Sequence, residues 1–121
     1  METDILEVVI AGRTFRGKFA DTPAACAFRK FLPLQIRMNE LNQNEKYAEL
    51  DGALPAAPRP VAGGIRTGDV MLYGNECLVL FYESFRTPYT YTRLAHLDDA
   101  EDLARALGAG SVEVSFCCVS K

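Results

Sequence analysis

The chain has 121 residues and a mass of 13.3 kDa, which is enough for a single domain and too little for two ordinary ones. Hydrophobic residues make up 49% of it and charged residues 24%, a composition that excludes a disordered or fibrous protein. Thirteen basic residues stand against sixteen acidic ones, and the net charge of −3 argues against nucleic acid as a partner.

The N-terminal quarter of the chain changes from a strand pattern to a helix pattern. Residues 4–20 alternate between apolar and polar positions on both sides of a short turn, which predicts a β-hairpin. Residues 22–32 predict a helix, because Asp21 or Thr22 can cap it and Pro23 suits its first turn. Cys26 falls on the polar side of that helix, so we expect it to be the most exposed thiol.

The middle of the chain is predicted to consist of strands and loops. Strands are expected at 34–38 and 45–50, although a turn of helix is an alternative for 45–50. The amide-rich segment 39–44 between them is expected to be a turn or a wide loop. Residues 51–64 hold three prolines and three glycines and predict a long loop, which is uncommon in a small domain unless it is functional or mobile.

The second half of the chain continues with strands around one further helix. The predicted strands are 65–73, 77–83, 89–97 and 111–118. Segment 77–83 is apolar on both faces, so we expect it at the centre of a sheet. A helix is predicted over 99–108, with Asp98 and Glu101 as its capping box and Gly108 at its end.

This order of elements predicts a mainly β fold. Many antiparallel strands with only two short helices favour a closed antiparallel barrel, because closure removes exposed sheet edges. The two helices are expected to cap the ends of the barrel, and residues 1–121 to form one domain.

The cysteines and the histidine do not have the spacing of a metal site. Cys26, Cys77, Cys117 and Cys118 form no C-x-x-C motif, and His96 is the single histidine. We expect four reduced thiols, with Cys77 as a small core residue. Flavin and nucleotide fingerprints are also missing, so neither a metal nor another cofactor is expected.

The ends and apolar runs of the sequence carry no targeting signal. The first four residues include two acids, where a secretory leader would be basic. The longest apolar run, 77–82, has the length of a strand and cannot span a bilayer. We therefore expect a cytoplasmic protein without a membrane partner.

Three segments resemble a bacterial and archaeal family of small cyclophilin-like domains. They are LPLQIRMNELNQNEKYAEL (32–50), GDVMLYGNECLVLFYESF (68–85) and YTYTRLAHLDDAEDLARALG (89–108). The resemblance extends from the first hairpin to Phe116 and implies a cyclophilin-like β-barrel.

Cyclophilins proper are peptidyl-prolyl isomerases with an arginine beside a row of apolar and aromatic side chains. Their F-H-R-I-I and F-M-x-Q-G-G-D segments are absent from this chain. By strand order, the resemblance places Arg37 near the first segment and Tyr47 near the second. It places Phe81 on a strand like the one that supplies a phenylalanine to the groove.

The candidate binding residues form an aromatic groove with arginines. Tyr89, Tyr91 and Arg93 share one face of a predicted strand. The full candidate set is Arg37, Tyr47, Phe81, Phe85, Tyr89, Tyr91 and Arg93. Such a surface suits an extended peptide or a planar small molecule with an acidic group. The alternative is that the tyrosines pack beneath the long loop and the arginines pair with glutamates.

Two weaker candidates are Glu45 with Glu49, and His96. A spacing of four places the two glutamates on one side of a strand or on one face of a helix. No other hydrolytic residues accompany them, so solvated surface acids are the favoured interpretation. His96 alternates with Leu94, which allows it to face inward, and a structural role is favoured.

Three functional hypotheses follow. The leading one is a non-catalytic module that binds a peptide or a small molecule. The alternative is a peptidyl-prolyl isomerase of degenerate motif, in which the Arg37 guanidinium is the candidate catalytic group because it can hydrogen-bond the prolyl nitrogen. The third is a structural or interaction module that acts through a homodimer surface.

Overall fold

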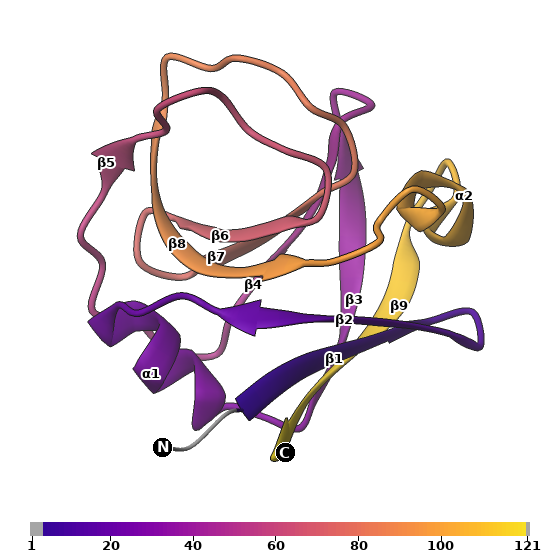
Figure 1. The fold of residues 1–121 in the computed structure, drawn as a ribbon, viewed down its shortest axis with the longest axis horizontal. Coiled ribbons are helices and arrows are strands. Elements are labelled where there is room, and N and C mark those ends of the chain that lie inside the picture. The colour runs from indigo at the N-terminus through magenta and orange to yellow at the C-terminus, as the bar shows by residue number, and fades with distance from the viewer. Residues whose placement is uncertain (1–3, 121) are drawn as a thin grey trace.

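The computed structural model describes residues 4–120, and in them eight antiparallel strands close into a barrel (Figure 1). The barrel strands are β1 (Asp4–Ile10), β2 (Arg13–Phe19), β3 (Leu34–Leu41), β4 (Glu45–Glu49), β6 (Asp69–Tyr73), β7 (Cys77–Phe81), β8 (Thr90–Leu97) and β9 (Val112–Ser120). A two-residue strand, β5 (Arg59–Pro60), pairs with β8, and the helices are α1 (Pro23–Arg29) and α2 (Leu103–Leu107). The predicted closed antiparallel barrel with two short helices is confirmed.

The barrel closes where β2 pairs with β8. Neighbouring strands follow the order β2-β1-β9-β3-β4-β7-β6-β8, and a further pairing of β2 with β8 joins the two edges. In this seam Gly17 pairs with Leu97. A Cβ atom on Gly17 would overlap the backbone carbonyl oxygen of His96, so the close approach of β2 and β8 requires glycine here.

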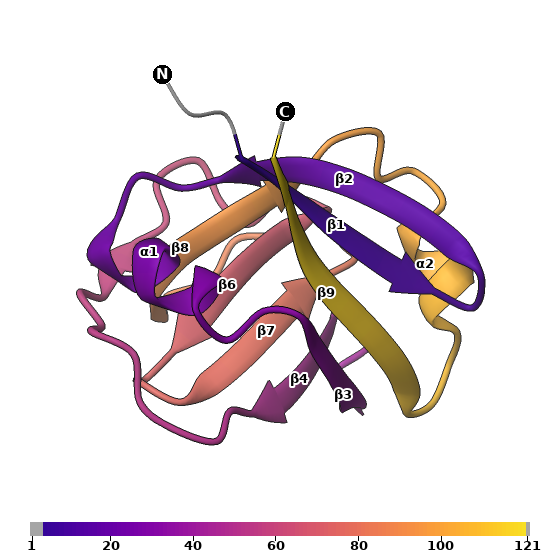
Figure 2. The ribbon, with the colours of Figure 1, turned by 90° about the horizontal axis from the view of Figure 1, so that it is seen from below.

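The two helices cover opposite ends of one hydrophobic core (Figure 2). Alternate residues of β1, namely Leu6, Val8 and Ile10, are fully buried inside the barrel. Phe28 of α1 and Leu103 of α2 are fully buried in the same cluster. Because each helix inserts one apolar side, the helices cap the barrel as predicted.

Both helices are shorter than the sequence pattern predicted. Thr22 caps α1, since its Oγ1 accepts a hydrogen bond from the Ala25 N–H at 3.0 Å, and Cys26 is exposed as expected. The predicted capping box at the second helix is wrong, because Asp99 adopts a φ of +49° and the helix starts only after Asp102. No helix within residues 4–120 has the length and hydropathy needed to cross a bilayer.

The segment 39–44, predicted to be a turn or a wide loop, is strand in its first half and turn in its second half. β3 continues to Leu41, and a tight turn follows in which Asn42 and Gln43 have φ values of +57° and +59°. Strand β4 begins immediately afterwards, with Glu45 paired to Leu41. The strand prediction for 45–50 is confirmed, and the short turn places the start of β4 beside the end of β3.

A β-bulge interrupts the alternation of β8. The register of β8 against β6 shifts at Leu94, so that Leu94 and Ala95 both face the core. His96 therefore points away from the core, and the inward orientation inferred from simple alternation is wrong. Its Nδ1 lies 2.7 Å from Oδ1 of the buried Asp69, which gives the histidine a structural partner.

Candidate functional site

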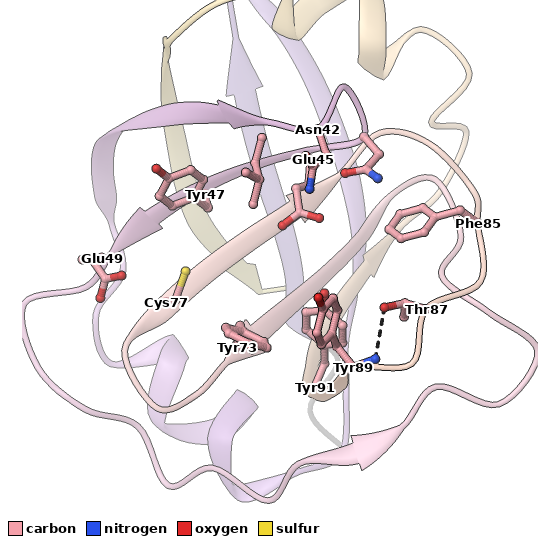
Figure 3. Close-up of a pocket in the computed structure, with 12 residues that line it drawn as sticks. Asn42, Glu45, Tyr47, Glu49, Tyr73, Cys77, Phe85, Thr87, Tyr89 and Tyr91 are labelled. Atoms are coloured by element: carbon pink, nitrogen blue, oxygen red, sulfur yellow. Dashed lines mark hydrogen bonds between the residues drawn. The ribbon is translucent and has the colours of Figure 1, made fainter.

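A pocket opens on the outer face of the barrel, over β4, β7, β6 and β8 (Figure 3). Its volume is about 360 Å³, which is within the range of small-molecule sites. It is lined by Leu41, Asn42, Asn44, Glu45, Tyr47, Glu49, Tyr73, Cys77, Phe85, Thr87, Tyr89 and Tyr91. The lining therefore combines strand residues with residues of the loop between β7 and β8.

A second hydrophobic cluster, outside the barrel core, supports the floor of the pocket. Its buried members are Ile65, Met71, Val79, Phe81 and Tyr91. Met71 and Val79 are paired across β6 and β7, and their side chains point outward because side chains alternate along each strand. Ile65 comes from the long segment after β5 and forms backbone hydrogen bonds with Phe85, which holds the two loops together above this cluster.

Aromatic rings form a continuous wall from the floor to the rim. The ring of Tyr91 lies 5.4 Å from that of Phe81 and 5.5 Å from that of Tyr73, centroid to centroid. Tyr73 in turn contacts Tyr89 at 6.1 Å, and Phe81 contacts Phe85 at 5.7 Å. These are favourable tilted and edge-on geometries, so the wall is well packed before any ligand arrives.

Exposed apolar side chains are concentrated at this pocket. Among residues 4–120, the large apolar side chains that remain exposed are Leu41, Tyr73, Tyr89 and Val119. Leu41, Tyr73 and Tyr89 line the pocket, with Tyr73 47% and Tyr89 59% exposed. An exposed apolar patch of this kind typically marks a binding site.

Strand β4 directs two carboxylates into the pocket. Glu45, Tyr47 and Glu49 face the pocket, while the alternate residues Lys46 and Ala48 face the barrel interior. Glu45 is only 8% exposed, and no described residue donates a hydrogen bond to it or forms an ion pair with it. Burial, reinforced by the negative charge of nearby Glu40, raises the pKa of Glu45 to about 7.

The Cys77 thiol and the Tyr91 phenol, which also line the pocket, are held in their neutral form. Burial, together with the charges of Glu49 and Glu45, raises the pKa of the Cys77 thiol to about 11. Burial and the charge of Glu45 raise the pKa of Tyr91 to about 12. A thiol with such a pKa is a poor nucleophile at neutral pH. Cys77 is half-buried at the pocket wall rather than in the core as predicted.

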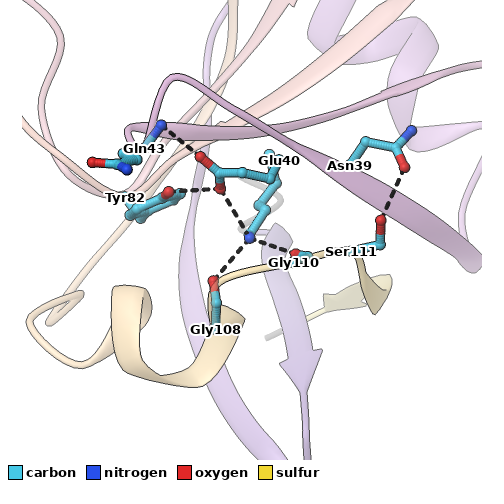
Figure 4. A network of polar contacts seen from close by, with 8 residues as sticks. Asn39, Glu40, Gln43, Tyr82, Gly108, Gly110 and Ser111 are labelled. Atoms are coloured by element: carbon cyan, nitrogen blue, oxygen red, sulfur yellow. Dashed lines mark hydrogen bonds and ion pairs between the residues drawn. The ribbon is translucent and has the colours of Figure 1, made fainter.

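Lys46 is fully buried in a polar network on the inner side of β4. Figure 4 shows the network around Glu40, Tyr82, Gly108 and Gly110. The Nζ of Lys46 donates hydrogen bonds to Oε1 of Glu40 at 3.0 Å and to the carbonyl oxygens of Gly108 and Gly110 at 2.8 and 2.6 Å. Glu40 Oε1 also accepts a hydrogen bond from the Tyr82 hydroxyl at 2.7 Å. The ammonium group is thus fully used on the inner side of β4 and is not available to the pocket.

The same network keeps Glu40 ionised. Burial by itself would raise the pKa of Glu40, but hydrogen bonds from Tyr82, Lys46 and the Gln43 N–H outweigh it and lower the pKa below its ordinary value. Glu40 is therefore a fixed negative charge close to Glu45.

The structure brings the predicted aromatic residues together and places the arginines elsewhere. Tyr47, Phe85, Tyr89 and Tyr91 line the pocket, and Phe81 lies beneath its wall. Arg37 is exposed on β3, opposite Glu113 of β9. Arg93 lines a neighbouring hollow with Arg59, and its NH1 lies 3.9 Å from Oδ1 of Asp69. The pocket is thus aromatic and acidic, and none of its described lining residues is basic.

Sequence reasoning gave too little weight to Glu45 and Glu49, and it missed Tyr73. The signal for the glutamates was available, because a period of two along a strand places them on the same face as Tyr47, which was already a candidate. For Tyr73 the signal was its alternation with Met71 at the end of a strand. Leu41 is the last residue of β3, and Asn42, Asn44 and Thr87 lie in turns and loops, where alternation does not predict the direction of a side chain.

Metal-binding clusters are absent from the described chain. Across residues 4–120, no three His, Cys, Asp or Glu side chains lie close enough together to hold a metal ion.

The relationship of the chain to known proteins rests on a family comparison. Searches among curated proteins and among solved structures returned no significant match. The sequence model of the cyclophilin-like family matches residues 8–117, from within β1 to within β9. The match covers nearly every barrel strand and both helices. The chain therefore belongs to the cyclophilin-like family.

Proposed function

We propose that this cyclophilin-like domain is a non-catalytic binding module whose outer pocket takes a small molecule or one side chain of a peptide. The observation that carries the proposal is the gathering of exposed Leu41, Tyr73 and Tyr89 in one pocket of small-molecule size. Tyrosine offers a large contact area and has few side-chain torsions to immobilise, so it is well suited to binding.

Two features support binding without catalysis. Prolyl isomerisation benefits from a cation that hydrogen-bonds the prolyl nitrogen as amide conjugation is lost. No described lining residue is basic, and Arg37 lies outside the lining. In addition, Cys77 and Tyr91 are held protonated, so neither supplies a nucleophile or a base at neutral pH.

We expect prolyl isomerisation by this domain to be at background level. The measurement is a protease-coupled assay on a proline tetrapeptide, with wild type and Arg37→Ala at equal concentration. Both proteins are expected to match the uncatalysed rate. Clear wild-type turnover that falls about 100-fold in Arg37→Ala, as expected on removal of a preorganised donor, would establish the isomerase alternative instead.

Ligand binding can be measured through the NMR signals of the tyrosines. The chain has five, of which Tyr47, Tyr73, Tyr89 and Tyr91 line the pocket and Tyr82 does not. We expect some members of a fragment library of neutral, anionic and cationic compounds to shift the four pocket tyrosines in ¹³C-tyrosine NMR spectra. Tyr82 serves as the internal control, and we expect its NMR signal not to shift.

Two variants test whether the fragments bind in the pocket. Tyr89→Ala removes a half-exposed part of the wall and is expected to weaken fragment binding about tenfold, because an aromatic contact of this kind contributes about 1 kcal/mol or more. Val119→Ala shortens an exposed apolar residue outside the pocket and is expected to leave binding unchanged. A library that moves no pocket tyrosine, or equal losses in both variants, would contradict the proposal.

A further inference from the structure

We infer that the group anchored in this pocket is an organic ammonium cation, an inference that rests on the binding role proposed above. Five aromatic rings and two carboxylates line the pocket, and its described lining residues carry no positive charge. Aromatic faces attract cations through their negative quadrupole, and carboxylates attract them by charge. Both kinds of side chain therefore favour the same ligand chemistry.

Glu45 is a buried acid without a partner. It is 8% exposed, and no hydrogen-bond donor or cation among the described residues satisfies its carboxylate. Figure 3 shows this carboxylate pointing into the space between the rings of Tyr47 and Phe85. An unpaired buried carboxylate is unfavourable, and a ligand cation in that space would supply the missing partner.

Among the described residues, no basic side chain forms an ion pair with Glu45. Lys46 follows it directly, but strand alternation turns Lys46 to the opposite face, where Glu40, Gly108 and Gly110 accept its three hydrogen bonds. Arg93 lines the adjacent hollow, with its NH1 3.9 Å from Oδ1 of Asp69, and the exposed Arg86 stands between Phe85 and Thr87 without lining the pocket. A ligand cation would therefore supply the positive charge that the described lining lacks.

A second carboxylate in the lining favours a cationic ligand over an anionic one. The Glu49 carboxylate stands near the rim, where it interacts with the Cys77 thiol. A carboxylate or phosphate ligand would meet like charge from Glu45 and Glu49, whereas an ammonium group would meet opposite charge from both.

The shape of the pocket favours an organic cation over a metal ion. Its volume of about 360 Å³ leaves room for several heavy atoms, and five of its twelve lining residues are aromatic. The described residues provide no group of three ligating side chains here. The apolar part of an organic cation would cover Tyr73 and Tyr89, which are otherwise exposed to solvent.

The geometry also makes binding dependent on pH. The titratable groups that interact electrostatically with Glu45 are Glu40 in β3, Cys77 in β7, Tyr82 just after β7, and Tyr91 in β8. Tyr47, Glu49, Tyr73 and Tyr89 line the same pocket. The pKa of Glu40 is lowered and those of the Cys77 thiol and the Tyr82 and Tyr91 phenols are raised, so within the interacting group only Glu45, with a pKa of about 7, titrates between pH 6 and 8. A bound cation favours the ionised carboxylate, so affinity should rise across this interval.

The test compares charged probes with neutral probes of the same shape. Choline is paired with 3,3-dimethyl-1-butanol, and Nα-acetyl-lysine methylamide is paired with its ε-acetylated form. Binding is followed by the shifts of the pocket tyrosines at pH 6 and pH 8. At pH 8 we expect at least one cation to bind about tenfold more tightly than its neutral partner. A response to choline alone indicates a free small molecule, and a response to the lysine derivative indicates a peptide side chain.

Two charge-removing variants provide the controls. Glu45→Gln is expected to weaken binding of the cation about tenfold and to abolish the increase in affinity from pH 6 to pH 8. Glu83→Gln removes the same charge from an exposed site outside the pocket and is expected to change neither quantity.

The outcomes separate this inference from the proposed function. If neutral or anionic probes shift the pocket tyrosines as well as the cations do, the ammonium assignment is overturned and the binding module stands. If none of these probes and no member of the fragment library shifts those tyrosines, both proposals fail.

Discussion

Replacing Lys46 with methionine is expected to lower the free energy of unfolding by about 3–5 kcal/mol. The Lys46 ammonium is fully buried and donates hydrogen bonds to Glu40, Gly108 and Gly110. Methionine has a similar length but no donor, so the substitution would leave the partly buried Glu40 carboxylate without its counter-charge and two carbonyl groups without a donor. Urea unfolding followed by far-ultraviolet circular dichroism provides the measurement.

Two further variants show whether the loss comes from this network. Lys18→Met removes an exposed lysine of β2 and is expected to change the free energy of unfolding by no more than about 0.5 kcal/mol. Tyr82→Phe removes one hydrogen bond to the ionised Glu40 and is expected to cost about 1.5–3 kcal/mol. A Lys46→Met protein as stable as wild type would mean that the network does not hold the loop between α2 and β9.

The second expected result is that Glu45→Gln stabilises the protein, and that it does so only at neutral and alkaline pH. Burial and the charge of Glu40 raise the pKa of Glu45 from 4.5 to about 7 in the folded state. Between these values the unfolded chain releases the proton while the folded chain retains it, so wild-type stability falls as pH rises through this window. One pKa unit corresponds to about 1.4 kcal/mol, and glutamine is not subject to this loss.

The corresponding measurement is the free energy of unfolding at pH 4 and at pH 8. At pH 8 we expect Glu45→Gln to exceed wild type by about 1–3 kcal/mol, and at pH 4 we expect the two proteins to agree within about 0.5 kcal/mol. Glu83→Gln, at an exposed position, should show no such difference between the two pH values. An equal effect of Glu45→Gln at both pH values would mean that the Glu45 carboxyl does not carry a raised pKa.

Most of the barrel could be predicted from local patterns in the sequence. Alternation over short stretches identified strands, because each strand of this barrel has one face toward a core. Thr22 and Pro23 marked the start of α1 correctly, since helix capping involves neighbours in the chain. The aromatic content of the site was also predictable, because Tyr89 and Tyr91 share a strand segment with a regular period.

The charge of the site depended on the tertiary structure. Arg37 and Arg93 were candidates on the strength of strand order and alternation, but their places around the barrel depend on how strands far apart in sequence pair. The direction of His96 depended on the bulge at Leu94, which is defined only by the pairing of β8 with β6. Neither the order of the strands around the barrel nor the bulge in β8 follows from the alternation of neighbouring residues.

The sequence by itself determined a mainly β barrel with aromatic residues on strand faces, because these features follow from the periods of neighbouring residues. Only the tertiary structure decided that Glu45 is a buried acid in an aromatic pocket. Its burial depends on how β4 lies between β3 and β7 beneath the surrounding loops, and burial is the main cause of its raised pKa. The charge of Glu40, which Lys46 and Tyr82 hold nearby, raises the pKa further. Desolvation and charge coupling act through space. The burial and the raised pKa of Glu45 can therefore be inferred only once the structure shows which residues distant in the chain lie near it.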